Sequence, residues 1–149
     1  MILAAISASI LFFPPPHSLR IVRGSWGDER MRVVDEDTGY VLAEKVEVVE
    51  GFWKRLRGQI LRKEPATLLF RGGSLHVHTC LVRFPLDLLF LKDGRAIKVV
   101  RGMKPWRFCL APKGSEVLLE FPPGTLKKGG VRKGHRIKLE GTQKRRVRW

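Results

Sequence analysis

The sequence predicts a single, mainly β domain, a small barrel or sandwich with one short helix. Three observations support this fold class. The chain has 149 residues, a length typical of one domain. Many short segments rich in Val, Leu and Ile alternate with Gly and Pro turns. Only one segment places its apolar residues at helical spacing.

The first predicted elements are a strand followed by the helix. Residues 40–50, YVLAEKVEVVE, are rich in Val and partly alternate, which predicts a strand. In residues 51–64, GFWKRLRGQILRKE, the apolar residues Phe52, Leu56 and Ile60 recur every four positions. These three share one face of a helix, so this segment is the predicted helix.

The rest of the domain is predicted to consist of strands and turns. Residues 95–100 alternate and follow a Lys-Asp-Gly turn, so they are expected to pair with the preceding strand as a hairpin. Residues 103–114, MKPWRFCLAPKG, form a loop punctuated by Pro. The predicted strands are residues 66–70, 75–82, 86–91, 95–100, 115–121 and 135–141.

Residues 1–30 differ from the rest of the chain. They begin with an apolar run, MILAAISASILFF, that three prolines interrupt, and the run is too short to span a bilayer. We interpret Met31 as the true start, which makes this segment a spurious extension; a signal peptide is the alternative. The expected organisation is this extension, a domain over 31–140 and a basic tail over 141–149, with no transmembrane segment.

The two cysteines and the amide content indicate the environment of the protein. Cys80 and Cys109 are too few for a disulfide framework, which favours a reducing, cytoplasmic location, or export if residues 1–30 are a signal peptide. The chain contains no Asn and is rich in Arg, Lys and Glu. That composition is typical of a thermophile.

The net charge of +15 is the strongest feature of the composition. A strongly basic protein attracts nucleic acid or anionic membranes. Residues 127–149 contain ten Lys or Arg residues and only one acidic residue, Glu140. This pattern predicts either a solvated tail or a nucleic-acid contact. The tail residues that would contact nucleic acid are Lys144, Arg145, Arg146 and Arg148.

A possible metal site lies at His76, His78 and Cys80, which alternate in LHVHTCLV. In a strand these residues share one face, and imidazole and thiolate groups are ligands for zinc. Same-face neighbours are about 7 Å apart, however, so one ion could reach all three only if the strand bent. The alternative is a half-buried face with hydrogen-bonded histidines, and we predict neither a metal nor a cofactor.

Asp87 is the second candidate, because a carboxylate between two leucines needs partners. Arg83 or backbone N–H groups at the Pro85 bend are the expected partners. Asp87 is then either a structural anchor for a turn or a polar anchor for a ligand. In the next loop, Trp106 and Arg107 can stack on a ligand or cover one end of the barrel.

These segments carry a family resemblance. The motifs are RLRGQILRK at 55–63, PLDLLF at 85–90 and LEFPPG at 119–124. Together they resemble the domain-of-unknown-function 192 family, also called uncharacterised protein family 0127, over residues 31 to about 140. The resemblance implies a compact, mainly β fold similar to a small barrel or jelly roll with a short helix. It implies no established activity.

The chain departs from the family pattern at three positions. Ile60 and Val82 replace residues that are usually Met, and His135 replaces an Asp. Because the sequence shows no paired catalytic constellation, we expect a small, non-catalytic ligand-binding or accessory module, with an unknown small ligand or protein as its partner. A nucleic-acid-associated protein is the alternative, and an enzyme with Asp87 as its base is the third reading. The expected ligand-binding residues are Thr79, Arg83, Asp87, Trp106, Arg107 and Glu120, with Phe84 as a wall.

Overall fold

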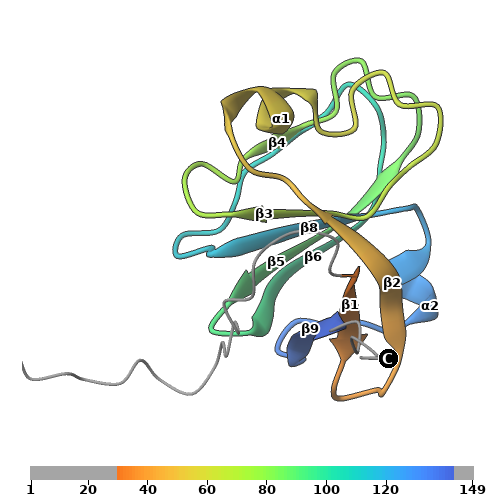
Figure 1. The fold of residues 1–149 in the computed structure, drawn as a ribbon, viewed down its shortest axis with the longest axis vertical. Helices are drawn as coiled ribbons and strands as arrows, with labels where there is room; N and C mark the ends of the chain where they lie inside the picture. The colour runs from red at the N-terminus through yellow and green to blue at the C-terminus, as the bar shows by residue number, and fades with distance from the viewer. Residues whose placement is uncertain (1–29, 143–149) are drawn as a thin grey trace, which may run out of the picture.

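The computed structural model describes residues 30–142, except for the side chains of Arg30, Phe52 and Thr142. Within this range the chain forms nine strands and two short helices (Figure 1). The elements are β1 (Arg30–Asp35), β2 (Val41–Val48), α1 (Phe52–Arg57), β3 (Leu68–Arg71), β4 (Val77–His78), β5 (Leu86–Lys92), β6 (Arg95–Met103), β7 (Phe108–Cys109), β8 (Val117–Phe121), α2 (Thr125–Lys128) and β9 (Ile137–Thr142).

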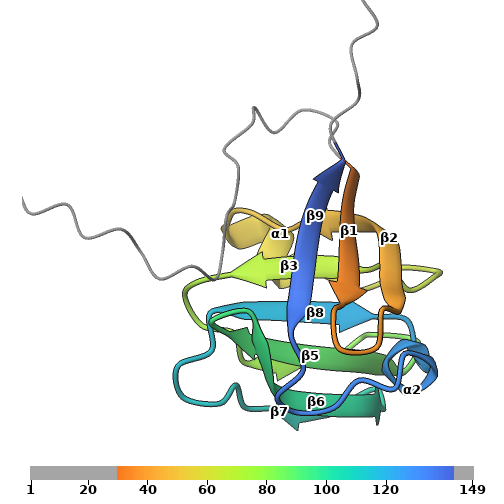
Figure 2. The same ribbon diagram turned by 90° about the horizontal axis from the view of Figure 1, so that it is seen from below.

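Seven of these strands form one curled sheet in the order β6-β5-β8-β3-β2-β1-β9. The pair β2–β3 is parallel, and α1 lies in the crossover between these two strands. The two edge strands approach each other where β6 begins and β9 begins (Figure 2). There Ala96 N donates to His135 O at 2.9 Å, and Ile137 N donates to Gly94 O at 2.8 Å. The expected small, mainly β, barrel-like domain is confirmed.

The sheet separates two hydrophobic cores because neighbouring residues of a strand face opposite sides. On β5 and β8, Leu89, Leu119 and Phe121 pack with β1, β9 and α2. Leu88 and Leu118 pack on the other side, with β4, β7 and the residues that follow α1. All five of these side chains are buried. A side chain of the first set and a side chain of the second set therefore lie on opposite faces of the sheet.

The hairpin of β5 and β6 is as predicted, with Lys92 opposite Arg95. The predicted helix over 51–64 is too long, because α1 ends where Gly58 leaves the helical conformation at a φ of 34°. Leu56, expected on the buried face of that helix, is 46% exposed. The predicted strand 75–82 is also too long: only β4 is extended, and Leu81 has a φ of 61°.

Three elements were not predicted, namely β1, β7 and α2, so the expectation of one helix is wrong. The strand β7 lies inside the loop predicted over 103–114 and pairs with β4 in a separate two-stranded sheet. The helix α2 is a single turn after Pro122 and Pro123, too short to give a periodic pattern. Neither helix of the described range has the length and apolarity needed to cross a membrane.

Candidate ligand-binding site

A cavity of about 360 Å³ lies between α1 and the face of the sheet that packs against β4 and β7. This volume is at the lower end of the range of small-molecule sites. Its lining combines apolar side chains with seven polar or charged residues, which are Arg55, Arg57, Gln59, Ser74, His76, His78 and Glu120. The lining residues are 55–60, 74–78, Phe70, Val82, Leu86, Leu118 and Glu120.

The walls of the cavity are held by side chains that bind backbone groups. The buried amide of Gln59 pairs with Ala66, donating to its carbonyl at 2.6 Å and accepting from its N–H at 3.2 Å. The guanidinium of Arg55 donates to the carbonyls of Gly72 and Arg71. These contacts fix the turn after α1 and the loop after β3, so the cavity has a preformed shape.

Glu120 is the unusual group in this cavity. It projects from the middle of β8, with Leu68 and Leu88 as its neighbours on the two flanking strands, and it is only 6% exposed. Its Oε2 atom makes no hydrogen bond to any group within residues 30–142. Burial raises the pKa of this carboxyl to about 7, although the Gln59 amide and the charge of Arg62 oppose the shift.

A buried carboxyl with a pKa near neutrality has two chemical properties. In its neutral form it can donate a hydrogen bond, and in its charged form it is a strong acceptor for a cation. An ammonium group placed beside it would favour the charged form and satisfy the free oxygen. The cavity therefore offers apolar surface from residues such as Phe70, Leu75 and Leu118, with Glu120 as the acidic group among the polar residues of its lining.

Asp87 has a different environment because it lies on the opposite face of the sheet. It is opposite Phe121 in the β5–β8 pair, one position away from the pair formed by Leu88 and Glu120. Its carboxylate accepts from the N–H of Gly102 at 2.8 Å and from that of Leu126 at 2.9 Å. Arg83 and the Pro85 bend are thus not its partners; Asp87 fastens α2 to the β5–β6 pair.

Thr79 is also fully buried and holds the loop between β6 and β7. Its hydroxyl donates to Lys104 O at 2.7 Å and accepts from Arg107 N at 2.9 Å. The Trp106 side chain is 61% exposed, and Arg107 and Arg83 are exposed as well. Of the six residues expected to form one ligand site, only Glu120 lines the cavity. The sheet and the loop place the others elsewhere.

His76 and His78 line the cavity, whereas Cys80 is not among its lining residues. The strand ends at His78, so Cys80 lies in the following turn. His76 instead accepts from Ala111 N through Nδ1 at 2.9 Å, and the ring of His78 contacts that of Phe108 at 6.4 Å between centroids. The His76 contact is a hydrogen bond of the kind that the alternative expects, whereas His78 makes a ring contact.

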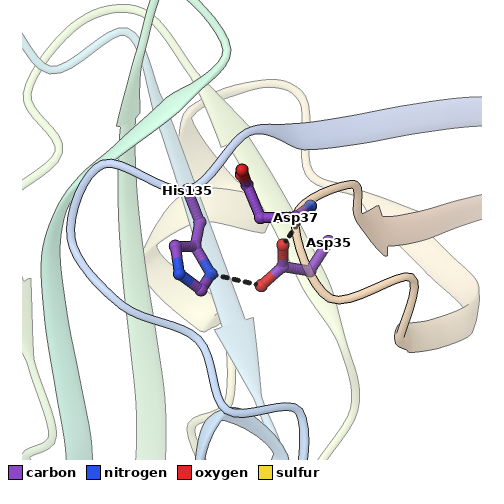
Figure 3. A group of neighbouring side chains, drawn as sticks. All are labelled: Asp35, Asp37 and His135. Carbon is purple, nitrogen blue, oxygen red and sulfur yellow. Dashed lines mark hydrogen bonds and ion pairs between the residues drawn. The ribbon is translucent and has the colours of Figure 1, made fainter.

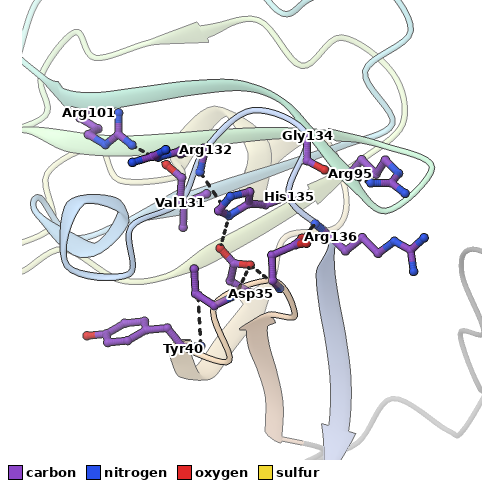
Figure 4. Close-up of polar contacts among 11 residues, drawn as sticks. Asp35, Tyr40, Arg95, Arg101, Val131, Arg132, Gly134, His135 and Arg136 are labelled. Atoms are coloured by element: carbon purple, nitrogen blue, oxygen red, sulfur yellow. Dashed lines mark hydrogen bonds and ion pairs between the residues drawn. The ribbon is translucent and has the colours of Figure 1, made fainter.

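Asp35, Asp37 and His135 form a polar cluster on the other side of the domain, with ligand atoms within 4.8 Å of one another (Figure 3). His135 Nδ1 lies 2.7 Å from Asp35 Oδ2, while Asp35 Oδ1 accepts from the N–H of Asp37. Figure 4 shows that Arg132 N also points at His135 Nδ1. That contact is longer, at 3.4 Å, and the Asp35 contact requires a protonated Nδ1. The cluster fastens the turn after β1 to the segment before β9.

Some sequence predictions lie outside the described residues, and the cavity itself was not predicted. The tail residues Lys144, Arg145, Arg146 and Arg148 are among the former. Gln59 was not recognised as a site residue. It lies seven positions after Phe52, hence on the apolar face of the predicted helix, and a polar residue there is the signal that could have revealed its buried role.

Comparison with known proteins places this fold in a known group. The model of the family DUF192, described as Uncharacterized ACR, matches residues 33–139. A UPF0127 protein of Pyrococcus furiosus is 26% identical over 98 residues, which cover 62% of this chain and 84% of that protein. A UPF0127 protein of Thermococcus kodakarensis is 24% identical over 119 residues, covering 76% of each chain.

Two crystal structures share the fold. A chain from Sinorhizobium meliloti, assigned provisionally as a transcription regulator, has a TM-score of 0.65 and 24% identity, covering 74% of this chain and 92% of that one. A protein of unknown function from Novosphingobium aromaticivorans has a TM-score of 0.63 and 18% identity, covering 72% and 82%. At these identities the likeness concerns the fold alone.

Proposed function

The chain belongs to the DUF192 family of uncharacterised proteins, and we propose that this member binds a small ligand in the cavity beneath α1. The ligand has an apolar body and an ammonium or similar hydrogen-bond-donating head that reaches Glu120. The observation that carries the proposal is the free Oε2 atom of Glu120, buried on the cavity floor. Buried polar groups in native proteins are normally hydrogen-bonded, so an unpaired oxygen in a preformed cavity supports a missing partner.

The cavity lining agrees with this ligand chemistry. Phe70, Leu75 and Leu118 supply apolar surface, and Gln59 is already paired with the backbone. Glu120 is the one acidic residue in the lining of the described cavity, so it is the group that would select a cationic donor. The residues opposite Glu120 in its two strand pairs are Leu68 and Leu88, so no nucleophilic side chain faces it across the described sheet, although Ser74 lines the cavity elsewhere. This arrangement supports binding rather than covalent catalysis.

The test compares benzylamine with benzyl alcohol as probes of the same shape. We expect benzylamine to raise the melting temperature of the wild-type protein saturably at pH 7.5 and to shift the NMR signals of the cavity residues. Benzyl alcohol should bind more weakly. The Glu120→Gln variant should lose the preference for the amine, whereas Glu44→Gln, an exposed change on β2, should keep it. Equal responses of all three proteins to both probes would refute the proposal.

A further inference from the structure

Three bulky apolar residues combine solvent exposure with a left-handed backbone. Leu61, Leu81 and Trp106 have φ values of 59°, 61° and 59°, and each is more than half exposed. The left-handed region is unfavourable for residues with large side chains. Asp93 is the remaining non-glycine residue with positive φ in the described range, and Asp tolerates this conformation. Backbone strain that burial does not explain is often found at functional surfaces.

The contacts between the loops bring these residues to one end of the molecule. Leu61 N donates to Leu81 O at 3.4 Å, and Trp106 N donates to Thr79 O at 3.0 Å. The β4–β7 pair places Phe108, which is 78% exposed, opposite His78. The elements α1 and β4 lie together at this end, away from β1 and β9 (Figure 1). We call Leu61, Leu81, Trp106 and Phe108 the apolar tip.

The chain segments that carry the apolar tip are predominantly cationic. Residues 53–63 contain five Lys or Arg, residues 72–84 contain one, and residues 102–113 contain three. None of these segments contains an Asp or Glu, although the chain has 14 acidic residues. The exposed Arg83 and Lys104 lie two residues from Leu81 and Trp106, respectively, in the sequence. The tip therefore combines exposed apolar side chains with cationic residues nearby in the sequence, of which Arg62 is paired with Glu47.

The side-chain types decide which anionic partner fits best. Aromatic groups can stack on nucleic-acid bases, but Leu61 and Leu81 have no ring to stack. Exposed Leu, Trp and Phe side chains surrounded by Lys and Arg are typical of surfaces that enter the headgroup region of an anionic bilayer. We propose that the apolar tip and its surrounding cations form a docking surface for an anionic lipid membrane, which the apolar side chains enter while the cations contact lipid phosphates.

The left-handed backbone supplies an unusually clean variant to test this surface. Glycine adopts positive φ without strain, so Leu61→Gly, Leu81→Gly and Trp106→Gly together remove the apolar groups while relieving the backbone. We expect the full chain to co-sediment with phosphatidylcholine vesicles containing about 30% phosphatidylglycerol and far less with pure phosphatidylcholine. The triple variant should bind the anionic vesicles at least about tenfold more weakly, with a melting temperature that does not fall.

The control is Asp93→Gly, which relieves the same kind of strain in the β5–β6 turn outside the tip; it should bind vesicles as the wild type does. If the triple variant fails to fold, Leu81→Gly alone and the exposed pair Arg83→Gln and Lys104→Gln give the same test. Undiminished binding by folded variants, equal binding to neutral vesicles, or no binding by the wild type would overturn the proposal. Tip-dependent binding to single-stranded DNA without vesicle binding would overturn it in favour of nucleic acid.

Discussion

Replacing Glu120 by Gln should increase the free energy of unfolding, relative to the wild type, more at pH 8 than at pH 4. The carboxyl is buried with a pKa of about 7, against 4.5 in the unfolded chain. Between these values the folded state holds a proton that the unfolded state releases, so the free energy of unfolding falls as the pH rises. The destabilisation that the buried Glu120 carboxyl causes is therefore small below pH 4.5, increases between pH 4.5 and pH 7, and is constant above pH 7.

The magnitude follows from the pKa difference. One pKa unit corresponds to 1.36 kcal/mol, so the shift of Glu120 corresponds to about 3 kcal/mol of lost stability at pH 8. Gln has nearly the same shape but does not titrate. Its own desolvation cost is the same at every pH, which leaves the difference between pH 4 and pH 8 as the quantity to measure.

The assay is urea denaturation of the wild type and of Glu120→Gln at several pH values from 4 to 8. We expect the variant to gain up to about 3 kcal/mol on the wild type across this interval, most of it between pH 4.5 and 7. Glu44→Gln, at an exposed position, controls for the loss of one negative charge. A difference between wild type and Glu120→Gln that stays constant with pH would refute the account of Glu120 as a buried, unpaired carboxyl.

Two further predictions concern the buried polar groups that hold loops. Asp87→Asn should lower the free energy of unfolding by about 2 to 3 kcal/mol, because the amide has one oxygen and its NH2 group would face either the N–H of Gly102 or that of Leu126. Urea denaturation measures this loss, and a loss below about 0.5 kcal/mol would contradict the role of Asp87 in fastening α2 to the sheet. Thr79→Val should cost about 1 to 3 kcal/mol and speed hydrogen exchange at the amide of Arg107; unchanged exchange there would show that the loop is held by other contacts.

The sequence allowed the strands to be predicted better than the site, and Asp87 and Glu120 show why. The apolar segments 86–91 and 115–121, each followed by turn residues, identified two strands correctly, yet no pattern within one strand states which face meets which partner. Only the pairing of Leu88 with Glu120 places the two acids on opposite faces of the sheet. Asp87 then meets the backbone of α2, a helix of one turn that has no periodic signal.

The loops were predicted less well because their conformation depends on contacts distant in the sequence. Leu81 breaks the expected strand 75–82 with a left-handed backbone, while its N-terminal neighbours bind the loop that contains Trp106. Local propensity for a Leu in an apolar segment favours an extended conformation, so tertiary contacts had to override it. The cavity depends on the same long-range contacts and on Gln59, so local sequence patterns could not predict it.

The pairing of β1 with β9 has a consequence for how this protein is made. Arg30 pairs with Thr142 and Asp35 with Ile137, so these strands are about a hundred residues apart in the chain. During synthesis β1 has an unsatisfied edge until almost the whole domain has left the ribosome. Such long-range pairing is slow to form and leaves an open strand edge that can pair with another chain. The nascent chain should therefore be most susceptible to aggregation just before residues 137–142 emerge.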